Sequence, residues 1–154
     1  MADFALLSWV AGPLNGFELV KPAEQGWDSA RAAWNLAVEQ SPAMVALPRS
    51  TDEVVAAVNF ARDNGLRVAV QAEGHSAGAL AGVGSDTLLL KMARMTGAEV
   101  DAESRRARVS AGARWCEVSM LASPRGLAAL SQAMLAGEPA VSATQRVAND
   151  PNLS

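Results

Sequence analysis

The chain has 154 residues and a mass of 16.0 kDa, which is room for one domain. Half of the residues are hydrophobic and 19% are charged, so we expect a folded chain, and a net charge of -3 excludes the basic face of a nucleic-acid-binding protein. A single cysteine, Cys116, excludes an internal disulfide, and a single histidine, His75, excludes a multi-histidine metal centre.

The first 26 residues are expected to form an irregular lead-in, since glycine and proline recur at Gly12, Pro13, Gly16, Pro22 and Gly26. Their apolar run, residues 4–11, follows an aspartate and no basic residue, so it lacks the positive region of a secretory signal. No stretch reaches the roughly 18–20 apolar residues of a membrane span. We therefore expect a soluble, cytoplasmic protein without a membrane partner.

Residues 28–71 carry the pattern of a βαβ unit that follows a first helix. Apolar residues at helical spacing predict that first helix over 28–39, with Asp28 as its N-cap. The apolar run 43–47 predicts a buried strand, and Ser50 with Glu53 has the spacing of a capping box at the start of a second helix. The run 67–71 predicts a second strand, parallel to and paired with the first.

A glycine-rich segment, residues 72–84, follows that strand, and residues 88–90 then predict a third strand. Residues 97–101 and 106–111 predict a hairpin, and residues 113–122 predict a helix. Residues 132–154 show no sustained periodicity, so we expect a poorly ordered tail.

The glycine-rich segment is the feature that points to a ligand. Such a turn after a parallel strand presents backbone N–H groups that bind phosphates, at the sheet edge where α/β folds place ligands. The alternative is an ordinary flexible loop. The spacing fits neither the P-loop nor the dinucleotide fingerprint. His75 lies inside this segment, and a neutral imidazole is a competent nucleophile.

Three stretches together resemble the PCMH-type FAD-binding domain of FAD-linked oxidases, the vanillyl-alcohol oxidase and berberine-bridge-enzyme-like proteins. They are residues 48–58 (PRSTDEVVAAV), 68–76 (VAVQAEGHS) and 112–118 (GARWCEV), and the similarity extends from about residue 27 to residue 131. In that family the glycine loop surrounds the FAD pyrophosphate and its histidine is joined to the flavin 8α-methyl carbon. The resemblance implies that His75 is the attachment residue and that the cofactor-binding residues are Gln71, Ala72, Glu73, Gly74, His75, Ser76 and Ala77.

The resemblance implies an α+β fold that is part of an FAD-binding domain, with a βαβ unit and a small parallel sheet followed by a second set of strands. It also implies an FAD-dependent oxidoreductase acting on a small alcohol, sugar or amine, with molecular oxygen as the electron acceptor. No residue can be named as a catalytic base. The alternative hypothesis is an inactive remnant of such an enzyme, or a small binding module without enzymatic activity.

The sequence departs from the family pattern inside the loop. The family has arginine where Gln71 stands and glycine where Ala72 and Glu73 stand. A carboxylate beside a pyrophosphate is unfavourable unless its side chain points to water, so Glu73 is expected to weaken FAD binding. We interpret Cys116 and Trp34 as core residues on the apolar faces of helices, and Trp115 likewise.

The resemblance stops after about residue 131, where the family continues with a second glycine loop. Reading residues 141–148 across their codon boundaries permits Val-Gly-Tyr-Thr-Ala-Gly-Gly, which resembles that loop. We therefore hypothesise that a frameshift between about residues 131 and 141 shortened a longer flavoprotein. A naturally short protein with an unrelated tail is the alternative.

Overall fold

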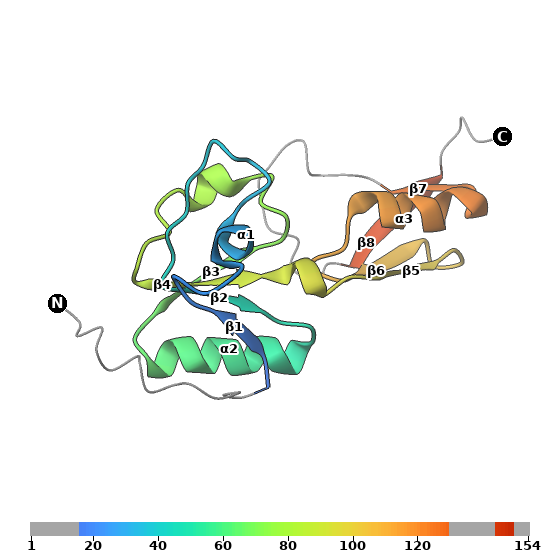
Figure 1. Ribbon diagram of the computed structural model, residues 1–154. Helices are drawn as coiled ribbons and strands as arrows, with labels where there is room; N and C mark the ends of the chain where they lie inside the picture. Colours follow the sequence, from blue (N-terminus) through green and yellow to red (C-terminus); the bar gives the residue numbers. More distant parts are fainter. Residues whose placement is uncertain (1–15, 130–143, 150–154) are drawn as a thin grey trace.

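The computed structural model describes residues 16–129 and 144–149, which form two lobes, each a sheet with helices packed on it (Figure 1). The first lobe contains the sheet β1-β2-β4-β3. Strand β1 is antiparallel to β2, whereas β2 and β3 both run parallel to β4. The bounds of its strands are β1 Glu18–Val20, β2 Met44–Leu47, β3 Arg67–Gln71 and β4 Thr87–Lys91.

The central position of β4 corrects the prediction that the two strands of the βαβ unit pair directly. All five residues of β4 are buried, whereas Arg67 and Val68 of β3 are exposed. The strand that is apolar on both faces, Leu88–Leu90, is therefore stabilised most in the middle of the sheet. Strand β3, with its charged first residue, takes the edge.

Helices cover both faces of the first sheet (Figure 1). Helix α2, Thr51–Asp63, packs Ala57, Phe60 and Ala61 against Met44, Ala46, Leu88 and Leu90. Helix α1, Trp27–Arg31, covers the opposite face together with the 3₁₀ turn η2, Ala77–Leu80. The alternation of these sheet residues with Val45 and Leu89 on the other face follows from the two-residue period of a strand.

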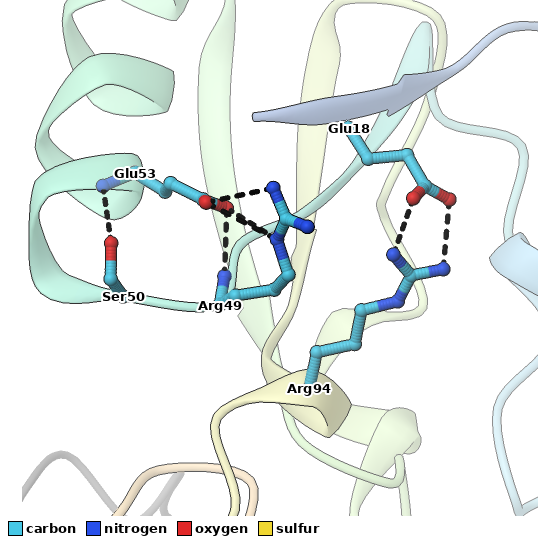
Figure 2. A network of polar contacts seen from close by, with 5 residues as sticks. All are labelled: Glu18, Arg49, Ser50, Glu53 and Arg94. Carbon is cyan, nitrogen blue, oxygen red and sulfur yellow. Dashed lines mark hydrogen bonds and ion pairs between the residues drawn. The ribbon is translucent and has the colours of Figure 1, made fainter. Parts of the chain in front are cut away.

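The start of α2 confirms the Ser50 N-cap and modifies the expected capping box, as Figure 2 shows. The Glu53 backbone N–H donates to Ser50 Oγ over 3.2 Å, and the Glu53 carboxylate accepts from the backbone N–H of Arg49 over 2.9 Å. That backbone hydrogen bond holds the pKa of Glu53 below its ordinary value. Figure 2 also shows Arg94, from the 3₁₀ turn η3 (Met92–Arg94), donating two hydrogen bonds to the Glu18 carboxylate of β1.

The first helix is shorter than predicted. It ends at Arg31, begins after Gly26 instead of Asp28, and gives way to an extended residue, Ala32. The Ala32 N–H still donates to Asp28 O, but the N–H groups of Trp34 and Asn35 bond to the glycine loop, described below, in place of helical partners. Tertiary hydrogen bonds therefore outweigh the helical periodicity of this segment.

The second lobe contains the sheet β5-β6-β8-β7, with helix α3 packed on it through Val118 and Ala122 against Ala107 and Leu127. Strands β5 and β6 form the predicted hairpin, and β8 lies between β6 and β7 in antiparallel pairing. The bounds are β5 Ala98–Asp101, β6 Arg106–Val109, α3 Trp115–Ala122, the 3₁₀ turn η4 Ser123–Arg125, β7 Leu127–Ala129 and β8 Thr144–Asn149.

These elements confirm the predicted α+β class. Residues 144–149 of the expected tail form strand β8, which pairs with β6 and β7 although their sequence predicts no strand. Residues 130–143, which include the whole of the proposed frameshift region, and 150–154 lie outside the described residues, as do residues 1–15 of the predicted lead-in. No helix in the described ranges is both long and apolar enough to cross a membrane.

Candidate cofactor-binding loop

The seven residues predicted to bind a cofactor form one turn at the carboxyl end of β3, beside the end of β4. Gln71 closes β3 in register with Lys91 of β4, and Ala77 opens η2. Gln71, Gly74 and Ala77 are buried, whereas Glu73, His75 and Ser76 are exposed. The loop therefore has an inner side packed on the lobe and an outer side open to a ligand.

Gly74 fixes the path of the loop. It adopts a left-handed conformation with φ of 86°, and a Cβ there would lie 2.8 Å from both Ala33 Cβ and Gln71 Nε2. Only glycine combines that φ with so close an approach. Two hydrogen bonds hold the loop against the 32–35 segment: Trp34 N–H donates to Glu73 O over 2.8 Å, and Asn35 N–H donates to Gly74 O over 3.3 Å.

These two contacts use carbonyl oxygens of the loop and none of its N–H groups. Among the described residues, the backbone N–H groups of Glu73, Gly74, His75 and Ser76 have no hydrogen-bond acceptor. The N–H of Ala77 instead donates to Gly74 O over 3.3 Å. Successive free N–H groups in a turn that includes a left-handed residue form a concave site for an anion such as phosphate.

The imidazole of His75 stacks on the indole of Trp34, with ring centroids 5.0 Å apart and an interplanar angle of 37°. Trp34 is 66% exposed, which shows that its interpretation as a core residue was wrong. Since α1 ends at Arg31, Trp34 is placed by its backbone bond to the loop and not by a helical face. Sequence reasoning missed this contact, because helical spacing was the only signal considered for Trp34.

Charged groups surround Glu73. Its Oε1 accepts from Arg114 Nε over 2.6 Å, and Arg114 is the N-cap residue of α3 in the second lobe. Lys91 is only 7% exposed and donates from Nζ to Ala32 O over 2.5 Å. Burial lowers the pKa of Lys91 below its ordinary value, and the Glu73 carboxylate partly opposes this shift. In the sequence, Lys91 could have been recognised as a lysine at the end of an apolar strand. No feature of the sequence indicated that Arg114 pairs with Glu73.

The side chain of Gln71 lies beneath the loop, 2% exposed, and neither Oε1 nor Nε2 has a hydrogen-bond partner among the described residues. Burying an amide without hydrogen-bond partners is energetically costly. The Gln71 side chain therefore leaves one acceptor and one NH₂ donor group beneath the loop that a ligand could satisfy. Together with the free N–H groups of residues 73–76, this donor set suits a polyanionic cofactor. The residues present therefore fit a pyrophosphate-containing group.

A cavity of about 610 Å³ adjoins the loop between the two lobes. Ala72, the first loop residue, lines it together with Val54 and Val70 of the first lobe and Arg108 and Val109 of the second. Its volume falls within the range of about 300–1,000 Å³ that is typical of small-molecule sites.

The prediction that Cys116 packs in the core was wrong: the residue is exposed on the first turn of α3. Trp115 is half-buried against the second core.

Comparisons with known proteins converge on one class. A family model described as an FAD binding domain matches residues 42–143. Glucooligosaccharide oxidase from Sarocladium strictum is 38% identical over 91 residues, which cover 58% of this chain and 18% of that protein. The structure of 6-hydroxy-D-nicotine oxidase from Arthrobacter nicotinovorans matches with a TM-score of 0.68 and 29% identity, over 79% of this chain and 27% of that one.

A structure of glucooligosaccharide oxidase from Acremonium strictum, described as carrying a 6-S-cysteinyl, 8α-N1-histidyl FAD, matches with a TM-score of 0.58 and 34% identity. This match covers 68% of the chain and 22% of the oxidase. The matches thus span between 18% and 27% of the length of these oxidases.

Proposed function

Because the chain belongs to the family of FAD binding domains, we propose that its glycine loop holds the pyrophosphate of FAD and that His75 carries the flavin covalently. The observation that carries the proposal is the row of free backbone N–H groups from Glu73 to Ser76, which includes the residue that bears the imidazole. The fold is that of part of a PCMH-type FAD-binding domain, which supports the assignment of FAD as the cofactor.

Each loop residue has a role in this proposal. The N–H groups of Glu73, Gly74, His75 and Ser76 donate to the phosphate oxygens, and Gly74 brings the backbone close to them. The buried Gln71 amide supplies polar groups at the end of β3. Ala72 keeps the approach free of bulk, while the buried Ala77 packs the inner side of the loop. Trp34 holds the His75 ring in place by stacking.

The covalent bond would join a ring nitrogen of His75 to the 8α-methyl carbon. His75 would hold the isoalloxazine ring through this bond, and molecular oxygen would serve as the electron acceptor of the bound flavin. Bound FAD supplies the hydride acceptor of an oxidase. We propose that the donor is a small alcohol, sugar or amine, in line with the oligosaccharide and nicotine named for the relatives.

Acid precipitation of the purified chain tests the attachment. The parent protein is expected to be yellow and to keep its flavin in the acid pellet. His75→Ala should release all flavin to the supernatant, while Ser76→Ala, a neighbouring exposed loop variant that keeps its backbone N–H, should retain it. Acid-stable flavin in His75→Ala would refute the attachment residue. A colourless parent that takes up no added FAD would favour the alternative of a module without redox activity.

A further inference from the structure

An ion pair joins the glycine loop of the first lobe to the helix of the second. Arg114 Nε lies 2.6 Å from Glu73 Oε1, and the two residues are 41 positions apart in the sequence. Both side chains are largely open to water, with 66% of Arg114 and 44% of Glu73 exposed. The pair is therefore a surface contact at the mouth of the loop and not part of either core.

The position of Glu73 creates an electrostatic conflict. Its backbone N–H is the first of four free donors that attract an anion, whereas its own carboxylate repels one. The cations that face this carboxylate are Arg114 from α3 and the buried Lys91 from β4. Lys91 already donates to Ala32 O, so Arg114 is the cation in direct contact with Glu73.

We propose that Arg114 sets the affinity of the loop for anionic cofactors by holding the Glu73 carboxylate toward α3. This inference rests on the proposed function, because it concerns the same pyrophosphate site. Arg114 is a positioning residue: without it the carboxylate is free to turn toward the bound anion, and this part of its benefit exists only while Glu73 is present. The ion pair thus allows a phosphate-binding loop to contain the acidic residue Glu73.

A structural role of the ion pair would affect the melting temperature, whereas a role in cofactor binding would affect the affinity for anions. An exposed ion pair contributes about 0–1 kcal/mol to folding, so its loss should leave the melting temperature nearly unchanged. The unpaired carboxylate, by contrast, should weaken anion binding about fivefold, the factor for one unit charge about 4 Å from another in bulk water. Salt should reduce this loss, since the screening length falls to about 3 Å at 1 M.

A double-mutant cycle tests the proposal. The parent, Glu73→Gln, Arg114→Gln and the double variant are titrated with FAD, and separately with inorganic pyrophosphate, at low and high salt. Arg114→Gln keeps the backbone N–H that donates to Glu117 Oε1 over 3.1 Å, so the start of α3 is preserved. Arg62→Gln is the matched control, because it removes an equally exposed arginine from an ion pair near the C-terminal end of α2.

The expected result is a loss of about fivefold in affinity for Arg114→Gln and a clearly smaller loss for the same substitution in the Glu73→Gln background, where no carboxylate can turn toward the anion. Arg62→Gln should bind like the parent. An equal loss in both backgrounds would overturn the inference while leaving the proposed function intact, since Arg114 would then act independently of Glu73. A parent chain that binds neither FAD nor pyrophosphate would overturn both.

Discussion

Gly74→Ala is expected to distort the glycine loop and to destabilise the first lobe. At φ of 86° an L-residue is strained, at a cost of roughly 1–2 kcal/mol. The new Cβ would also lie 2.8 Å from Ala33 Cβ, closer than van der Waals contact permits, and overpacking of this kind costs about 1–3 kcal/mol. Together the two effects predict a loss of about 2–5 kcal/mol in the free energy of unfolding.

Gly78→Ala is the matched control. Gly78 lies in the same glycine-rich segment, has no positive φ, and a Cβ there meets nothing within 4 Å. This change should be neutral or stabilise the protein by up to about 1 kcal/mol, because alanine restricts the unfolded chain. Urea unfolding followed by tryptophan fluorescence measures both variants. Equal stabilities would refute the reasoning, since they would show that the loop moves away from the 32–35 segment at no cost.

Two further substitutions test the surroundings of the site. Burial lowers the pKa of Lys91 in the folded protein below 10.5, so between the folded pKa and 10.5 the unfolded chain binds more protons than the folded one. The parent protein therefore gains stability as the pH rises through this window. Lys91→Met should abolish this gain. A stability difference between the two proteins that stays constant from about pH 7 to 10.5 in urea titrations would contradict this. Ser50→Ala should cost about 0.5–2 kcal/mol by removing the acceptor for Glu53 N–H, and unchanged thermal unfolding would show that the N-cap contributes nothing.

Local signals in the sequence were sufficient for several elements. The Ser50 N-cap, the 98–109 hairpin and helix α3 depend on contacts between residues close in sequence, which propensity and spacing register directly. The loop itself was also recognisable, because a glycine-rich turn after a strand is a local pattern.

Other features depended on contacts between distant parts of the chain. The 32–35 segment has helical spacing, yet it forms hydrogen bonds to the loop and to Lys91, so Trp34 lies against His75 and not in a core. Strand β8 pairs with β6 and β7, which lie far from it in the sequence, although its own sequence shows no strand period.

By itself, the sequence determined the chemistry available at the loop: a single histidine among glycines, after a parallel strand, in a pattern that resembles an FAD-binding domain. The tertiary structure alone decided which groups remain free for a ligand. The carbonyl oxygens of Glu73 and Gly74 accept from the 32–35 segment, whereas the N–H groups of residues 73–76 have no acceptor among the described residues. It also decided that the charge of Glu73 is met by Arg114, because ion pairing depends on distance in space and not on separation along the chain.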